Sequence, residues 1–177
     1  LAYEKLDDPL SLGILLDYGK SNICLALSET IELKIDEKNK ASRGNVAFIG
    51  GGNYASRVLI PAFKTAGANL TALVTSRGFS AVHHGKKNGF AVASTNIEQA
   101  LTEQTDAVVI VTQHNLHASQ SIQALSKKKH VFVEKPLALT HSDINNIEIA
   151  QKESGTIIMV GYNRRFSPHI KEIKRLL

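Results

Sequence analysis

A glycine-rich segment that follows an apolar run is the part of this sequence whose residue types most directly indicate a chemistry. Residues 45–49 read Asn-Val-Ala-Phe-Ile, and the residues after them form the pattern G-x-G-x-x-A. In such a segment Gly50 permits a tight turn from strand to helix, Gly52 lets the backbone approach a pyrophosphate, and the small Ala55 lets the helix pack closely. Free N–H groups and the dipole at the start of the helix favour phosphate. The candidate cofactor contacts in this segment are Gly50, Gly52, Asn53, Tyr54 and Ala55.

The glycine segment has two alternatives to a dinucleotide site. A P-loop is excluded because no Gly-Lys-Ser or Gly-Lys-Thr follows. A glycine-rich turn without a ligand stays open on the motif alone. Its position after a strand, before a helix and at the head of a series of strands favours the dinucleotide site.

The end of the second predicted strand bears on which dinucleotide is bound. In NAD-binding sites an Asp or Glu at this point takes the ribose hydroxyls, but the sequence here reads Val74-Thr75-Ser76-Arg77. Ser76 and the fork-shaped donor Arg77 are suited to a 2'-phosphate instead, which favours NADP(H) over NAD(H). The alternative is that Arg77 lies over the adenine ring or in solvent.

Short β-rich apolar runs alternate with segments of helical periodicity from Gly44 onward. This alternation predicts an α/β fold with a doubly wound, mostly parallel Rossmann sheet in a three-layer αβα arrangement. The expected strands are 45–49, 70–75, 90–93, 107–112, 130–134 and 157–161. The expected helices are 54–66, 78–88, 96–103, 116–127 and 141–154. Pro61 lies inside the first of these helices, where it removes a hydrogen bond and is expected to bend the helix.

Composition excludes several classes of protein. The 177 residues are 43% hydrophobic and 21% charged, with a mean hydropathy of -0.08, which is typical of a globular chain. No apolar run is long enough to span a membrane, and no secretory signal is visible. The one cysteine, Cys24, cannot form an intramolecular disulfide. A cytoplasmic location is therefore expected.

The positive charge of the chain raises the question of nucleic acid as a partner. The net charge of the whole chain is +5, and the positive excess lies in residues 44–177, which hold fifteen Lys and Arg against eight Asp and Glu, whereas residues 1–43 hold six against eight. The dense run Lys127–Lys129 follows a helical pattern, where lysines complement the helix dipole and face solvent. Because no aromatic residues are interleaved with this run, no nucleic-acid partner is expected.

Several motifs, taken in chain order, resemble those of the Gfo/Idh/MocA oxidoreductase family. The glycine segment is followed by residues 108–118 (VVIVTQHNLHA), 130–139 (HVFVEKPLAL) and 160–168 (VGYNRRFSP). Pro61 also falls where the family carries a helical proline. The Glu-Lys-Pro triplet at 134–136 is the most specific mark of the resemblance.

This resemblance implies an NAD(P)-dependent oxidoreductase that transfers hydride to or from a sugar, sugar nucleotide or polyol. Lys135 matches the family lysine that hydrogen-bonds the reacting hydroxyl or carbonyl, where an ammonium would stabilise negative charge developing on oxygen. Glu134 is implied to hold the nicotinamide side, and the Lys135–Pro136 peptide is a candidate cis bond. The loop after the fourth strand is implied to contact the cofactor through Thr112, Gln113, His114 and His117. Gln113 departs from the proline or arginine that is more common at its position.

His114 and His117 have a second interpretation as a pair of metal ligands. No third ligand and no His-Glu-x-x-His pattern accompanies them. They are therefore interpreted as part of a loop that begins a helix, and no metal is expected.

The chain is expected to divide into three parts. These are the tail of a preceding module and a linker at 1–43, the NAD(P)-binding domain at 44–166, and the start of a connection to a further substrate domain at 167–177. Residues 2–6 and 12–18 are similar to the closing helix and strand of medium-chain, zinc-type alcohol dehydrogenases, which implies a two-part fusion protein. Residues 30–35 alternate as a further strand. Since the last helical pattern stops at Leu177, the chain is interpreted as a piece of a longer protein.

The resemblance also bears on what the chain can do by itself. The acid–base Asp and His of the family would lie in the further domain, so the chain alone is expected to bind the cofactor without turnover. Any homo-oligomer is expected to form through that domain. The alternative to an enzyme is a non-catalytic dinucleotide-binding regulatory module, which would lack a following sheet-rich domain with Asp and His. A methyltransferase is disfavoured because the glycine motif and the Glu-Lys-Pro triplet suit a dinucleotide better.

Overall fold

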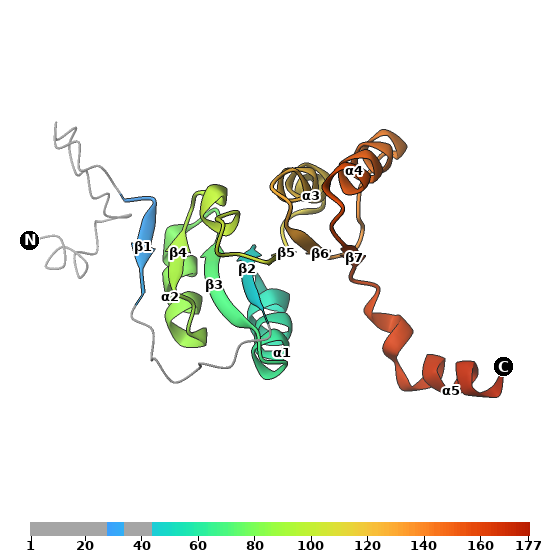
Figure 1. Cartoon of the computed structure of the whole chain (residues 1–177). Coiled ribbons are helices and arrows are strands. Elements are labelled where there is room, and N and C mark those ends of the chain that lie inside the picture. The colour runs from blue at the N-terminus through green and yellow to red at the C-terminus, as the bar shows by residue number, and fades with distance from the viewer. Residues whose placement is uncertain (1–27, 34–43) are drawn as a thin grey trace, which may run out of the picture.

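A seven-stranded sheet forms the centre of the protein in a computed structural model that describes residues 28–33 and 44–177. The strands are β1 (Thr30–Glu32), β2 (Asn45–Ile49), β3 (Asn69–Val74), β4 (Val92–Ser94), β5 (Ala107–Ile110), β6 (His130–Val133) and β7 (Ile158–Val160). Their spatial order is β1-β4-β3-β2-β5-β6-β7, and every neighbouring pair is parallel except β1 with β4 (Figure 1). The strand order reverses at β2, as in doubly wound nucleotide-binding sheets, which confirms the predicted fold class.

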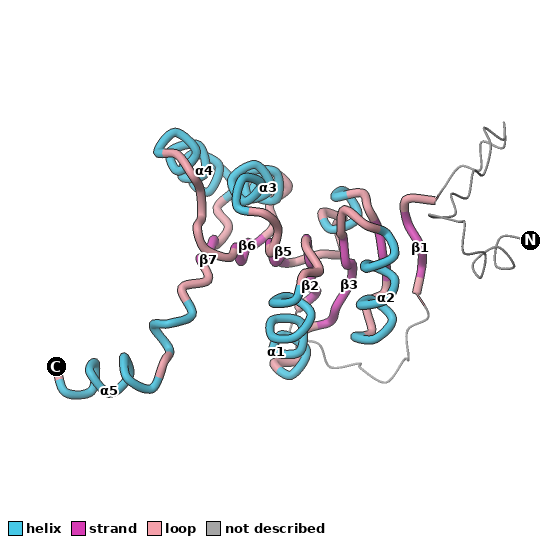
Figure 2. Tube along the Cα trace, turned by 180° about the vertical axis from the view of Figure 1, so that it is seen from behind, coloured by secondary structure: helices cyan, strands magenta, loops and turns pink. Residues whose placement is uncertain are grey.

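Helices cover both faces of this sheet, as Figures 1 and 2 show. The α-helices are α1 (Ile60–Thr65), α2 (Gly78–Asn88), α3 (His117–Ser126), α4 (His141–Ser154) and α5 (Pro168–Leu176). Residues of α1 and α2 belong to one hydrophobic cluster, and residues of α3 and α4 belong to a second. Along β2, Val46 and Phe48 face the first cluster while Ala47 and Ile49 face the second. This alternation places the sheet between two helical layers. α5 extends away from the sheet after β7 (Figure 1).

A cluster of phenylalanine side chains fills the core under α1 and α2. The Phe48 ring meets the Phe63 ring edge to face, with centroids 5.4 Å apart, and the Phe90 ring in the same way at 5.8 Å. Such edge-to-face pairs add to the burial of apolar surface. They fix β2, and therefore the glycine segment after it, against the helices on this face.

The helix expected at 54–66 has two parts. Residues Ala55–Leu59 form a π-helical turn, and α1 continues from Ile60 with Pro61 in its first turn. Because Pro61 has no N–H, it cannot donate to the carbonyl one α-helical turn earlier, and the change of helix type falls next to it. The change of hydrogen-bond pattern is what the structure has beside Pro61, and the bend expected there stays a prediction.

One expected helix is wrong in type and length. Residues 96–103 contain only a 3-10 turn, Ile97–Ala100, which begins at Asn96, whose side chain accepts a hydrogen bond from the Glu98 N–H. The apolar residues of this segment have helical spacing, but a single turn is enough to bury Ala100 and Leu101 completely or nearly so. Two further 3-10 turns, His114–Leu116 and Asn163–Phe166, precede α3 and α5.

The first part of the chain is described only at residues 28–33. The strand expected at 30–35 is confirmed over β1, which lies at the edge of the sheet (Figure 1). The helix and strand that resemble alcohol dehydrogenases, at 2–6 and 12–18, lie outside the described residues. Over the two described ranges, the protein has no helix with the length and apolar character needed to cross a membrane.

Candidate cofactor-binding site

Two adjoining pockets form a cleft across the carboxyl ends of the parallel strands. The larger pocket has a volume of about 730 Å³ and lies at the ends of β2, β3 and β5. The smaller has a volume of about 420 Å³ and lies beside the ends of β5 and β6. Gly52, Val111 and Thr112 line both pockets and join them into one site. This is the edge of a doubly wound sheet at which ligands bind.

Every predicted site residue lines this cleft. Those in the larger pocket alone are Gly50, Ser76, Arg77 and Gln113. Those in the smaller pocket alone are Asn53, Tyr54, Ala55, His114, His117, Glu134 and Lys135. Gly52 and Thr112 belong to both. Residues from four separate segments of the sequence are thus brought together at one edge of the sheet.

Gly50 makes the turn out of β2 in a conformation that requires glycine. Its φ is +105°, and a Cβ atom at this position would lie 2.3 Å from the carbonyl oxygen of Val111. Its N–H donates to the Val74 carbonyl at 2.8 Å. Any side chain would collide with backbone, so glycine is required for β2 and the loop after β5 to approach this closely.

Gly52 and Ala55 serve the cleft and the packing beneath it. A Cβ atom on Gly52 would meet no atom of the described residues within 4 Å, so the backbone here faces open space. Asn53 and Tyr54 form the first helical residues after Gly52, and Ala55, which follows them, is fully buried. The combination leaves space beside backbone N–H groups at a helix start, which suits a pyrophosphate.

Hydroxyl groups fix the backbone at the far end of the larger pocket. The hydroxyls of Thr75 and Ser80 both donate to the carbonyl oxygen of Arg77, at 2.6 and 2.8 Å. The Thr75 N–H donates to the Ser94 carbonyl at the end of β4, at 3.0 Å. The side chains of Ser76 and Arg77 are exposed and lie in the pocket wall. The position of the Arg77 guanidinium at this rim therefore depends on a backbone held by neighbouring side chains.

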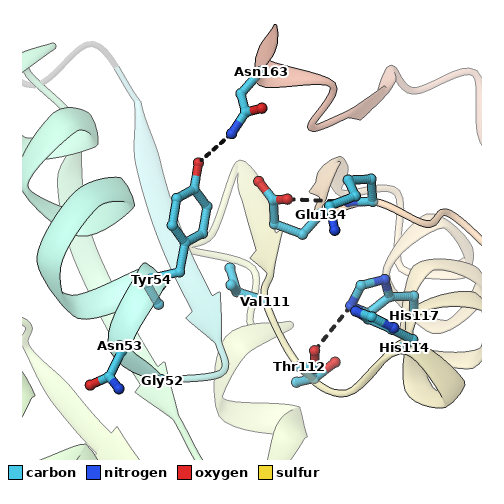
Figure 3. Close-up of a pocket in the computed structure, with 11 residues that line it drawn as sticks. Gly52, Asn53, Tyr54, Val111, Thr112, His114, His117, Glu134 and Asn163 are labelled. Atoms are coloured by element: carbon cyan, nitrogen blue, oxygen red, sulfur yellow. Dashed lines mark hydrogen bonds between the residues drawn. The ribbon is translucent and has the colours of Figure 1, made fainter.

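His117 is 1% exposed and joins two loops of the smaller pocket. Its Nδ1 lies 2.7 Å from the Pro136 carbonyl oxygen. Its Nε2 lies 3.1 Å from the Thr112 carbonyl oxygen (Figure 3). A neutral imidazole donates through one nitrogen only, whereas the doubly protonated ring donates to both carbonyls. In both forms the ring nitrogens are directed at backbone. The described residues hold no group of three His, Cys, Asp or Glu that could bind a metal ion.

Glu134 carries an acceptor that lacks a partner. The residue is 9% exposed, and its Oε2 accepts weakly from the Lys135 N–H at 3.3 Å. Its Oε1 is buried without a hydrogen bond from any of the described residues. Gly161 leaves room for this oxygen, since a Cβ atom there would come within 2.6 Å of it. A buried acceptor without a donor is unfavourable, so Glu134 fits a site in which a ligand supplies the donor.

Lys135 presents a cation beside this carboxylate. Its side chain is exposed and lines the smaller pocket, and its peptide bond to Pro136 is cis, as expected. A lysine ammonium has three donors and no acceptor. The Lys135 ammonium can therefore donate a hydrogen bond to an oxygen atom of a ligand in this pocket and stabilise negative charge on that oxygen.

Asn163 is a candidate site residue that the sequence does not single out. Its Nδ2 donates to the Tyr54 hydroxyl at 3.1 Å, and both side chains line the smaller pocket (Figure 3). Asn163 follows the last strand at its carboxyl end, which is the one signal in the sequence for a place at this edge. Other lining residues that the sequence does not single out are Thr75, Ser80, Thr95, Ile97 and Gln120.

Comparisons with known proteins match this arrangement to one family. The sequence model of the GFO_IDH_MocA family, described as "Oxidoreductase family, NAD-binding Rossmann fold", matches residues 44–162. A 4-carboxy-2-hydroxymuconate-6-semialdehyde dehydrogenase of Sphingobium sp. is 30% identical over 124 residues, which are 70% of this chain and 39% of the relative. A 1,5-anhydro-D-fructose reductase of Ensifer adhaerens is 27% identical over 118 residues, which are 66% of this chain and 35% of the relative.

A solved structure shows the same fold. The crystal structure of an NAD binding oxidoreductase from Klebsiella pneumoniae matches with a TM-score of 0.64 and 25% identity, over 77% of this chain and 39% of that one. The chain spans 35% to 39% of the length of the two curated relatives. The family match begins at residue 44 and lends no support to the likeness of residues 2–18 to alcohol dehydrogenases.

Proposed function

The chain belongs to the Gfo/Idh/MocA oxidoreductase family, with its NAD-binding Rossmann fold, and we propose that it binds NAD(P) for hydride transfer to or from a sugar, sugar nucleotide or polyol. The observation that carries this proposal is the position of Gly52. It faces open space at the start of a helix and lies between two pockets that together have room for the two halves of a dinucleotide.

The side chains of the two pockets indicate the orientation in which the dinucleotide would bind. Ser76 and Arg77 offer donors in the larger pocket, which suits the adenosine ribose and its phosphate. Glu134 and Lys135 lie in the smaller pocket, which suits the nicotinamide and the substrate. The unpartnered Oε1 of Glu134 would accept a hydrogen bond from the nicotinamide side of the cofactor.

Lys135 is the proposed catalytic residue. The cofactor supplies or accepts the hydride when it is bound. The Lys135 ammonium would donate a hydrogen bond to the substrate oxygen. It would stabilise the negative charge that develops on this oxygen as the carbon–hydrogen bond forms or breaks. His117 would act as a positioning residue, because its contact with the Pro136 carbonyl holds the segment that carries Lys135. Thr112, Gln113 and His114 would contact the cofactor from the loop after β5.

The proposed preference is for NADP(H) over NAD(H). No carboxylate occurs between Val74 and Arg77, where an NAD-binding site normally carries one for the ribose hydroxyls. Arg77 offers a fixed fork of donors that matches a phosphate. A 2'-phosphate at this rim would therefore find a cation where the ribose hydroxyls of NAD(H) would find no carboxylate.

The substrate class and the domain division are part of the same proposal. The name of the Ensifer adhaerens relative, a 1,5-anhydro-D-fructose reductase, supports a sugar-like carbonyl compound. We propose that residues 44–166 are the cofactor domain and that 167–177 begin the connection to a substrate domain. The exposed apolar side chains of Ile170 and Ile173 on α5, which extends away from the sheet, support such a connection (Figure 1).

Nicotinamide fluorescence titrations with NADPH and NADH test the proposal directly. We expect both to bind, with the lower Kd for NADPH, and S-adenosylmethionine not to compete. Failure of both dinucleotides to bind would contradict the function, and a lower Kd for NADH would contradict the role of Arg77. The chain alone is expected not to oxidise polyols or reduce sugar ketones. Measurable turnover would contradict the need for a further domain.

A further inference from the structure

Residues 28–33 add a strand to the sheet outside the segment that matches the family. β1 pairs antiparallel with β4 in the register Thr30 with Ser94, Ile31 with Ala93 and Glu32 with Val92. Hydrogen bonds extend the pairing at both ends, from the Thr95 N–H to the Glu29 carbonyl at 2.9 Å and from the Leu33 N–H to the Ala91 carbonyl at 2.8 Å. β1 therefore covers the whole length of β4, which would otherwise be the edge of the described sheet.

A side chain anchors this strand in the core. Leu33 is 6% exposed and packs in the cluster that contains Phe90 and Ala81. A Cβ atom on Gly85 of α2 would come within 2.6 Å of the Leu33 Cδ1, so Leu33 occupies the space that this glycine leaves. Burial of a leucine side chain in a fitted space stabilises the attachment of the strand.

Ser94 connects the other end of the strand to the body of the domain. Ser94 is 2% exposed, and its hydroxyl donates to the Glu29 carbonyl at 2.8 Å and lies 2.9 Å from the Thr30 hydroxyl. The same oxygen accepts from the Asn96 N–H at 2.9 Å. Residues 29 and 30 thus hold the segment in which β4 ends and the next turn begins.

That segment forms one wall of the larger pocket. Thr95 and Ile97 line the pocket, and the Ser94 carbonyl accepts from the Thr75 N–H, directly before Ser76 and Arg77. We propose that residues 28–33 are a positioning element for the adenosine end of the cofactor cleft, which fixes the end of β4 and, through it, the turn after β3. This inference rests on the proposed function, because it assigns the larger pocket to the adenosine half.

A proline in β1 tests the role of the strand in the full chain. Ile31 faces Ala93 as a hydrogen-bonded pair, because the pairs two residues away on each side, Glu29 with Thr95 and Leu33 with Ala91, are joined by hydrogen bonds. The Ile31 N–H therefore donates within this pair. Ile31→Pro removes that N–H at an exposed position, and Ile31→Val is the matched control that keeps it. Leu33→Ala is a second variant, which weakens the anchor without a proline.

The readout separates the two halves of the cofactor. We expect Ile31→Pro and Leu33→Ala to raise the Kd for adenosine 2',5'-bisphosphate by about tenfold, and to change the Kd for reduced nicotinamide mononucleotide by less than about twofold. Ile31→Val is expected to bind both as the wild type does. Amide hydrogen exchange at Ala93 and Thr95 reports whether the strand has detached.

Two results would overturn the inference while the proposed function stands. The first is faster exchange at Ala93 and Thr95 with an unchanged Kd for the adenosine fragment. The second is an equal loss of affinity for both fragments, which would indicate a general effect on folding. A wild-type chain that binds neither NADPH nor NADH would contradict the proposed function itself, and the inference with it.

Discussion

The side chain of Asn163 donates a hydrogen bond to the hydroxyl of Tyr54 at 3.1 Å, across 109 positions of sequence. Tyr54 lies directly before the π-helical turn that follows the glycine segment, and Asn163 begins the turn after β7. The contact therefore joins the helix that follows β2 to the turn that follows β7. It lies on the side of the smaller pocket where Glu134 lies (Figure 3).

Removal of this contact is expected to affect the nicotinamide end of the site. Tyr54→Phe and Asn163→Ala should each raise the Kd for reduced nicotinamide mononucleotide by about threefold, because each removes one hydrogen bond that holds the wall of the smaller pocket. Fluorescence titration measures this Kd. In the double variant the increase should be no larger than in either single variant, since both break the same bond. Additive increases would show that the two side chains act independently.

Gly50→Ala is expected to destabilise the fold strongly. The loss in the free energy of unfolding should be about 2–4 kcal/mol, because the new Cβ would lie 2.3 Å from the Val111 carbonyl oxygen at a φ of +105°. Urea unfolding monitored by circular dichroism measures this loss.

A matched control for Gly50 is Gly155, at the end of α4. Gly155 also has a positive φ, +67°, but a Cβ there would meet no atom of the described residues within 4 Å. Gly155→Ala should therefore cost about 1 kcal/mol, from the backbone conformation alone. Equal losses at the two positions would show that the approach of Gly50 to Val111 is not what requires glycine.

His117→Leu should destabilise the protein by about 3 kcal/mol, because it removes a buried ring whose nitrogens face the carbonyl groups of Thr112 and Pro136. His114→Ala, three residues earlier at an exposed position, is the control and should change stability by less than about 0.5 kcal/mol. Urea unfolding of the two variants measures the difference. A loss at His117 as small as that at His114 would contradict the role of the buried ring.

Arg77→Ala should reduce discrimination between the two dinucleotides. The Kd for NADPH is expected to rise by about tenfold while the Kd for NADH stays within about twofold, because only NADPH carries the 2'-phosphate. Arg57→Ala removes the same charge from an exposed position outside both pockets and should change neither value. A parallel loss of affinity for NADPH and NADH in Arg77→Ala would place Arg77 elsewhere on the cofactor.

The sheet could be predicted closely because its signals are local. The strand at 45–49 contains the continuous apolar run 46–49 and ends at a glycine turn, and its observed bounds agree with the prediction. The clustering of Gly52, Thr112 and Glu134 follows from the same prediction, because each comes after a parallel strand and these ends share one edge.

Other features depend on partners that are distant in sequence. The hydrogen bond between Tyr54 and Asn163 requires the assembled sheet, and nothing near either residue specifies it. The 3-10 turn at Ile97–Ala100 replaces an expected helix because burial of Ala100 and Leu101 needs only one turn. The unpartnered Oε1 of Glu134 results from the packing of Gly161 against it, which periodicity does not indicate.

The most direct test of the central claim is the Kd for NADPH of a Gly52→Asp variant. Gly52 has no positive φ, and a Cβ atom there would meet no atom of the described residues within 4 Å, so the substitution is expected to preserve the fold. Its carboxylate would stand where the pyrophosphate is proposed to lie, and the Kd should rise by about a hundredfold or more. Gln104→Asp, an equal charge change at an exposed position outside both pockets, should bind NADPH as the wild type does. Equal Kd values for Gly52→Asp, Gln104→Asp and the wild type would contradict a dinucleotide site at the glycine turn.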